Sequence, residues 1–133
     1  NQDYCLVVLV DADDQSCVDL KQQLVNLYQT LDQKPENVLF RIAVEEMESW
    51  FVADLDAVKQ AYPSADISGL QDIAPDSIVG AWERLAESLG KKPIQCRGAD
   101  KYEWAQKISP HLNLDVPFSP SLATFVTGIG HYL

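Results

Sequence analysis

Two short runs of apolar, largely β-branched residues lie near the start of the chain, at residues 4–10 and 38–44. Uninterrupted apolar runs of this length are typical of strands that are buried on both faces of a parallel sheet. Between them an apolar stripe recurs at helical spacing, formed by Leu20, Leu24, Leu27, Tyr28 and Leu31. The pattern predicts a strand, a helix and a second strand, which is the right-handed βαβ unit of parallel sheets.

Polar residues predict the limits of this first helix. Ser16 is placed to cap its first turn, with Asp19 three residues later in the capping-box position. Asp14 is equally suited to a capping role. The pair Lys34-Pro35 ends the helix, because proline cannot continue it.

Shorter helices are predicted for most of the remaining chain. One begins near Glu45, a second is capped by Asp54, and a third runs from Ile78 to Leu89. The last two are a helix indicated by Ala105, Ile108 and Leu112, which ends near Pro110, and one that Ser119 caps, with Pro120 at its first position. Residues 64–77 are loop-like, and residues 93–96 are predicted to form a short edge strand.

Together these elements predict a single α/β domain over residues 1–133, with a parallel sheet flanked by helices. Two strands are too few for a stable sheet, so we expect further strands from an upstream segment or a partner chain. The chain begins at Asn1 just before the first strand, and we therefore expect it to be the C-terminal portion of a longer protein.

The excess of acidic over basic residues makes some classes of binding partner unfavourable. The formal net charge is −10, from 20 acidic and 10 basic residues, and this field repels phosphate backbones. Simple nucleic-acid binding is disfavoured unless metal ions reverse the local sign. No apolar run approaches the roughly 20 residues that span a bilayer, so no membrane partner is expected. The three cysteines show no CxxC spacing, which favours reduced thiols and a cytoplasmic location.

Acidic residues follow both predicted strands. Asp11 and Asp13 come at the end of the first strand, and Glu45, Glu46 and Glu48 follow the second. Since ligands bind beyond the carboxyl ends of parallel strands, these side chains predict a site for Mg²⁺ or Mn²⁺, whose preferred ligands are oxygens. We predict Asp11, Asp13 and Glu46 as ligands, and Glu48 as a residue that orients a base or holds a metal-bound water. The alternative is that they cap helices or lie on solvated surfaces.

A second set of residues late in the chain could bind phosphate. It comprises Arg97, Lys101, Ser119 and Ser121, which lie in predicted loops and helix starts. Surface charges and caps are the alternative for this set. Lys21 could lean towards the acids or lie on an exposed helix face. We predict surface or packing roles for both histidines, and core positions for Trp50, Trp82 and Trp104.

Two segments carry a family resemblance. They are residues 9–21, with Asp11-Ala-Asp13-Asp14 and the Leu20-Lys21 pair, and residues 41–54, with the sequence Arg-Ile-Ala-Val-Glu-Glu-Met-Glu-Ser-Trp-Phe-Val-Ala-Asp. Together with Lys101, Ser119-Pro-Ser121 and Phe125, they resemble a bacterial and archaeal family of domains of unknown function (family 4276).

That family is similar to Toprim domains, the Mg²⁺-binding fold of topoisomerases, primases and the ATPase-coupled nucleases of phage defence. The resemblance implies that Asp11 and Asp13 form a Toprim-type DxD pair and that Glu46 is a further acid. Toprim sites also use a Glu at the end of an earlier strand. The sequence begins too close to the DxD pair to include that strand, so we expect either an upstream segment that supplies this Glu or an incomplete site.

Three functions remain open from the sequence. The first is a metal-dependent nuclease acting on nucleic-acid phosphodiesters, with Glu46, Glu48 and Lys101 as catalytic residues. The second is a non-catalytic interaction or regulatory domain that works with a partner ATPase. The third is a receiver-like phosphoacceptor or another phosphotransfer role, but the sequence offers no convincing acceptor Asp after a later strand.

Overall fold

The computed structural model describes residues 4–133 and has a sheet of two parallel strands, β1 (Cys5–Asp11) and β2 (Asn37–Ala43). In this part of the chain the sheet is accompanied by six α-helices, so the predicted α/β class is confirmed. The register places Cys5 opposite Asn37 and Asp11 opposite Ala43, so both strands end at the same edge. The predicted βαβ unit is therefore present, with its two acidic segments side by side.

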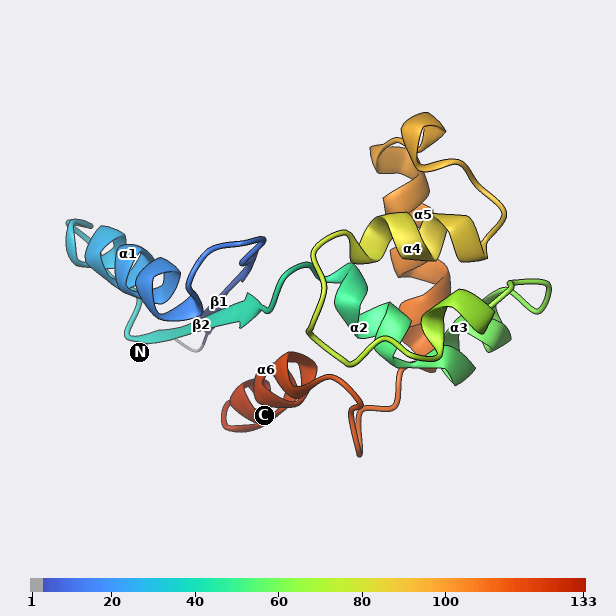
Figure 1. Cartoon of the computed structure of the whole chain (residues 1–133). Coiled ribbons are helices and arrows are strands. Elements are labelled where there is room, and N and C mark those ends of the chain that lie inside the picture. Colours follow the sequence, from blue (N-terminus) through green and yellow to red (C-terminus); the bar gives the residue numbers. More distant parts are fainter. Residues whose placement is uncertain (1–3) are drawn as a thin grey trace.

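The first helix connects the two strands, and the other five follow β2. Their bounds are α1 (Cys17–Gln29), α2 (Glu48–Ala53), α3 (Leu55–Ala61), α4 (Ala81–Ser88), α5 (Gly98–Ile108) and α6 (Pro120–Gly130). Three short 3₁₀ turns, η1 (Ser68–Leu70), η2 (Pro93–Gln95) and η3 (Ser109–His111), lie between them. In Figure 1 the sheet lies beside α1 and α6, while α2 to α5 form a separate group of helices on the other side.

The predicted caps at three helix starts are confirmed. Ser16 Oγ accepts a hydrogen bond from the Asp19 amide (3.3 Å), and Asp54 Oδ1 accepts one from the Ala57 amide (3.0 Å). Ser119 Oγ accepts one from the amide of Leu122 (3.1 Å), with Pro120 at the first helical position. Such bonds satisfy amides that have no partner within the helix itself.

Several predicted element boundaries are wrong. The first helix ends at Gln29 and does not continue to Lys34-Pro35, and the helix predicted from Ile78 begins at Ala81, because Gly80 before it has a left-handed φ of 87°. Residues 93–96 form the turn η2 instead of an edge strand, because the Cys96 amide bonds back to the Pro93 carbonyl (3.0 Å). The helix expected near Glu45 begins at Glu48, since Glu45 has a left-handed φ of 63° that a helix cannot contain. The helix around residue 105 starts earlier, at Gly98, where Asp100 accepts a hydrogen bond from the Arg97 amide.

The main hydrophobic core lies among the helices and not on the sheet. Its fully buried side chains include Trp104, Leu85, Ile108 and Val58, contributed by α5, α4 and α3. A smaller cluster joins Ala43 of β2 and Trp50 of α2 to Leu122 of α6. Trp50 and Trp104 are thus core residues as predicted, while Trp82 is half-buried.

The prediction that both strands are buried on both faces is wrong for β1 in the described residues. Leu6 and Val7 are 39% and 40% exposed. The physical reason is that α1 and α6 both pack on β2, while β1 has β2 as its one strand neighbour among residues 4–133. The apolar stripe of α1 is also only partly covered, since Leu27 is exposed, and Leu31, which was predicted to belong to it, lies after the end of the helix and is exposed as well.

No helix in the described part of the chain has the length and apolar character needed to cross a membrane.

Trp50 joins the smaller hydrophobic cluster to the rest of the fold, so replacing it should lower the stability of the protein. Its ring is 7% exposed, packs 5.4 Å from the ring of Phe125, and donates from Nε1 to Ser121 Oγ (2.8 Å). We expect Trp50→Ala to lower the free energy of unfolding by about 3–5 kcal/mol in urea denaturation. Ser121→Ala, which removes the hydrogen bond and keeps the ring, should cost about 1–2 kcal/mol. A Trp50→Ala transition at the wild-type midpoint would contradict this packing.

Candidate functional site

A cavity of about 530 Å³ opens where β1 ends, between α2, α5 and α6. One end is polar and carries the side chains of Asp11, Glu48 and Lys101. The remaining wall is apolar and includes Trp50 and Phe125. Three of the residues predicted from the sequence therefore line a single cavity, although they come from β1, α2 and α5.

Asp11 is held at the polar end of this cavity. Its Oδ1 accepts a hydrogen bond from the amide of Met47 (3.0 Å), directly before α2. Burial raises the pKa of Asp11 above its usual value, and the charges of Glu48 and Asp13 raise it further. The Met47 hydrogen bond and the charge of Lys101 oppose this shift in pKa. Asp11 is thus a carboxylate whose ionised form would be stabilised by an added positive charge.

Glu48 and Lys101 form the ion pair of the cavity. Lys101 Nζ lies 3.4 Å from Glu48 Oε1 and 4.6 Å from the centre of the Trp82 ring. The ring and the carboxylate together hold the ammonium group in place. Trp82 was predicted only as a core residue, and its contact with Lys101 could not be read from the sequence because the two residues lie on different helices.

Asp13 is exposed in the loop that follows β1. Its amide donates to the carbonyl of Glu45 (2.6 Å), and the amide of Ala12 donates to the carbonyl of Ala43 (2.9 Å). These bonds extend the pairing of the strands into the two acidic loops. Asp13 and Glu45 both have a left-handed φ, at 50° and 63°. Non-glycine residues in this conformation are strained and cluster at functional sites.

Glu46 is turned towards a different part of the fold. Its side chain is buried, with 8% exposure, and its two carboxylate oxygens accept the amides of Gly80 (3.3 Å) and Trp82 (3.1 Å) at the start of α4. Burial raises the pKa of Glu46, these two hydrogen bonds lower it, and the charges of Glu48 and Glu83 raise it. Glu46 therefore has a structural role that the sequence did not indicate, because its partners lie more than 30 residues later.

The other predicted phosphate-binding residues are already engaged. Arg97 donates from Nη1 to the carbonyls of Ile94 (3.1 Å) and Cys96 (2.9 Å), within its own turn. Ser119 Oγ and the Ser121 amide both donate to the carboxylate of Asp76 (2.7 Å each), a residue that sequence reasoning missed. The loop around Asp76 carries no local signal for this role.

Lys21 lies away from the acids and lines a different cavity. His111 and His131 are both exposed, in line with the predicted surface role.

The carboxylate oxygens at this site could provide some of the ligands that a hard cation such as Mg²⁺ needs. Within residues 4–133, no three His, Cys, Asp or Glu side chains are gathered so that they could hold a metal ion. Mg²⁺, however, commonly binds through one or two carboxylates and fills its shell with water and phosphate oxygens. Asp11 and Glu48 line the cavity, and in the loop beside them Glu45 Oε2 is buried without a hydrogen-bond partner. These oxygens fit a weak, water-rich site, so metal binding stays a prediction.

The raised pKa of Asp11 predicts a pH-dependent effect of Asp11→Asn. Because the folded state holds this proton more tightly than the unfolded state, Asp11 destabilises the fold once the pH has risen through its pKa. In metal-free buffer, Asp11→Asn should therefore have a higher melting temperature than the wild type at pH 7. The difference should disappear below about pH 3.8, the ordinary Asp value, where both side chains are neutral.

Asp14→Asn is the matched control, since Asp14 is an exposed acid in the same loop. It should melt as the wild type does, apart from a small charge effect, at every pH. A higher melting temperature for Asp11→Asn that persists unchanged at pH 3 would contradict the explanation from burial.

Comparisons with known proteins support the family resemblance. The family model described as "Domain of unknown function (DUF4276)" matches residues 1–130. Searches of the curated proteins and of the solved structures found no match. The matched range includes both acidic segments, Lys101 and the start of α6, and so contains the whole of the candidate site. The chain therefore belongs to the DUF4276 family.

Proposed function

We propose that this domain is a Toprim-like, Mg²⁺- or Mn²⁺-dependent nuclease that acts on nucleic-acid phosphodiesters. The observation that carries the proposal is the position of Asp11 at the end of a parallel strand, in one cavity with Glu48 and Lys101. Burial and neighbouring carboxylates both raise the pKa of Asp11, so a divalent cation would relieve an unfavourable charge there.

The residues divide into three roles in this proposal. Asp11 and Asp13 would hold the metal, which would neutralise the developing phosphoryl charge and favour ionisation of water. Glu48 would hold or orient the metal-bound water, and Lys101 would hold a phosphate oxygen at the polar end of the cavity. Glu46 supports them indirectly, because its bonds to Gly80 and Trp82 fix the turn between β2 and α2.

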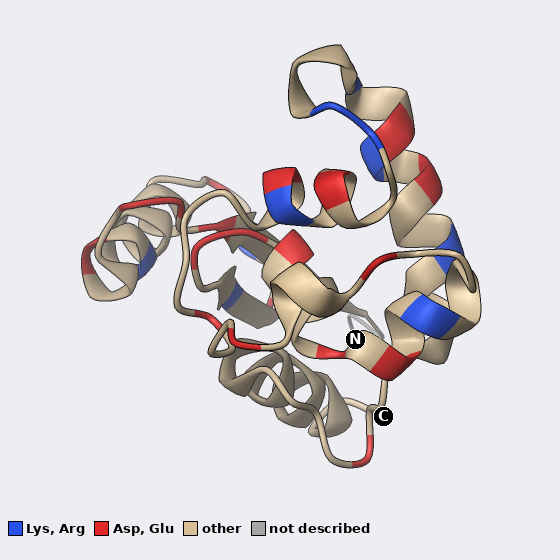
Figure 2. Ribbon diagram, turned by 45° about the vertical axis from the view of Figure 1, so that its right-hand side comes forward, with Lys and Arg blue, Asp and Glu red and all other residues tan. Residues whose placement is uncertain are grey.

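The charge of the chain determines how substrate would be bound. Figure 2 shows acidic residues along the loops that lead into the helices, whereas basic residues are scattered and form no continuous strip in that view. A net charge of −10 weakens the attraction of a phosphate backbone at long range. We therefore propose that metal ions and a basic partner are both needed for productive binding of nucleic acid.

The first test is metal binding by calorimetry on the wild type, Asp13→Asn and Asp14→Asn. Asp13→Asn should lose most of the heat of Mn²⁺ or Mg²⁺ binding, because a carboxylate ligand has become a neutral amide. Asp14→Asn removes the same charge one residue later and should bind as the wild type does. Equal heats for all three proteins, or none for any of them, would contradict the metal site.

The second test is cleavage of plasmid and single-stranded DNA and RNA, with and without chelator, in the presence of a partner ATPase where one is found. Asp11→Asn and Asp13→Asn should remove nearly all cleavage, because electrostatic stabilisation of the transition state is commonly the largest catalytic contribution. Cleavage that persists in chelator would rule out the mechanism.

A second candidate function is a non-catalytic interaction domain that works with a partner ATPase, as in phage defence. It is favoured by the exposed apolar side chains of β1, Leu6 and Val7, beside an unpaired strand edge in the described residues. Metal binding without cleavage under any condition would favour this function. Either function is compatible with a reducing cytoplasm, because Cys5, Cys17 and Cys96 are all free thiols.

A further inference from the structure

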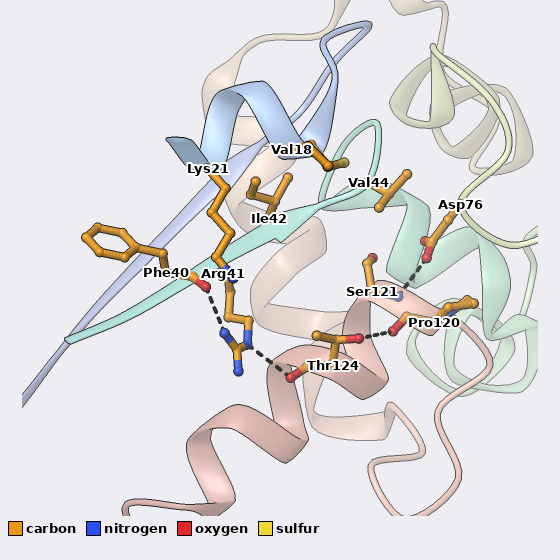
Figure 3. Close-up of a pocket in the computed structure, with 11 residues that line it drawn as sticks. Val18, Lys21, Phe40, Arg41, Ile42, Val44, Asp76, Pro120, Ser121 and Thr124 are labelled. Carbon is orange, nitrogen blue, oxygen red and sulfur yellow. Dashed lines mark hydrogen bonds between the residues drawn. The ribbon is translucent and has the colours of Figure 1, made fainter. Parts of the chain in front are cut away.

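A second cavity, of about 430 Å³, lies beside β2 between α1 and α6 (Figure 3). It is distinct from the acidic cavity. Helix α6 contributes Leu122 and Phe125 to the acidic cavity, but Pro120, Ser121 and Thr124 to this one. Its volume falls within the range of about 300–1,000 Å³ that small-molecule sites occupy.

Two basic side chains line this cavity, and neither has an acidic partner among residues 4–133. Neither Lys21 of α1 nor Arg41 of β2 has a carboxylate within ion-pair distance in the part of the chain that the structure describes. In Figure 3, Lys21 extends from α1 across β2 towards Arg41. Four other basic residues of the described part of the chain are ion-paired with acids, whereas these two place their positive charges together at one concave surface, which favours an anionic ligand.

The Arg41 side chain is held in a fixed orientation, and not all of its N–H donors are used. Its Nε donates to the Thr124 carbonyl (3.2 Å) and its Nη1 to the Phe40 carbonyl (2.8 Å). A guanidinium group has five N–H donors, and these two bonds leave three without a hydrogen-bond partner among the described residues. A fixed planar fork of this kind suits a carboxylate or a phosphate group.

Gly128 of α6 provides the space for this orientation. A Cβ at this position would lie 2.3 Å from Arg41 Nη2 and 2.6 Å from Nε, so any larger residue would displace the guanidinium group. The close approach of Arg41 to α6 therefore depends on a glycine in the interior of a helix, where glycine otherwise costs about 1 kcal/mol relative to alanine.

The rest of the cavity determines the kind of anion. Its walls beside the cations are apolar and include Val18, Phe40 and Ile42. At the other end, Asp76 is bonded to Ser119 and Ser121 at the start of α6, so a negative charge already occupies that helix terminus. Asp76 would repel a ligand that carries negative charges at both ends.

We infer that this cavity binds a small organic anion, with a single carboxylate or phosphate group at Lys21 and Arg41 and an apolar body between α1 and α6. The charge of the chain and the size of the cavity disfavour nucleic acid as the occupant. The inference does not depend on the proposed nuclease function, since none of these residues belongs to the acidic site.

The test uses four probes of similar shape and different charge in metal-free buffer with chelator. Benzoate and phenyl phosphate carry the two anionic groups, benzamide is neutral, and benzamidine is cationic. Ligand-observed NMR and calorimetry should show binding of at least one anion and none of benzamide or benzamidine. The relative affinity of the two anions distinguishes a carboxylate ligand from a phosphate ligand. Absence of binding by both anions, or equal binding of benzamide, would overturn the inference.

Three variants test whether the anion binds in this cavity. Gly128→Ala keeps every charge and displaces Arg41, so it should weaken anion binding about tenfold while the protein stays folded. Lys21→Gln should weaken it about threefold, a smaller effect because Lys21 is exposed. Lys34→Gln is the charge-matched control at an exposed position outside the cavity, and it should bind as the wild type does. Equal affinities for Gly128→Ala and wild type, or equal losses for Lys21→Gln and Lys34→Gln, would overturn the assignment.

Discussion

The fold depends on acidic side chains that accept backbone amides at the starts of helices. The first amides of a helix have no partner within it, and the helix dipole makes the same position favourable for a negative charge. Five of the helices begin against a carboxylate. The carboxylates are Asp11 at the residue before α2, Asp54 at α3, Glu46 at α4, Asp100 at α5 and Asp76 at α6. These five acidic side chains therefore serve the fold as hydrogen-bond acceptors.

Several of these bonds also join parts of the chain that are far apart in sequence. Asp54 additionally accepts the amide of Asn113, 59 residues later, and Asp76 accepts that of Ser121, 45 residues later. Because the helical core and the sheet form separate hydrophobic clusters, such polar contacts hold the sheet, the helices and α6 in one arrangement. The indole of Trp50 completes this set through Ser121.

Because some carboxylates bond to backbone amides, fewer of them are available to bind a metal ion or a substrate. Both oxygens of Glu46 are occupied by amides, whereas Asp11 uses one oxygen for Met47 and lines the cavity beside Glu48. The acids at this edge thus include one whose oxygens are both bonded to backbone amides and others that face the cavity. The cations are divided as well, with Lys101 at the acidic cavity and Arg41 at the second one.

The sequence by itself determined the features that depend on neighbouring residues. The apolar runs predicted both strands, and the caps at Ser16, Asp54 and Ser119 were identified because their bonds reach only three residues ahead. The strand ends also placed Asp11 and the acids after β2 along one edge, because parallel strands end together.

Only the tertiary structure decided the partners of individual side chains. Glu46 and Asp76 bond to amides 34 to 45 residues away, and no local pattern encodes such a distance. Residues 93–96 form a 3₁₀ turn closed by the Cys96 amide, although their composition suits a strand edge, and neither strand of the described sheet pairs with them. The position of Arg41 against Gly128 likewise arises only when α6 packs on β2, because packing between distant segments decides which charges remain unpaired.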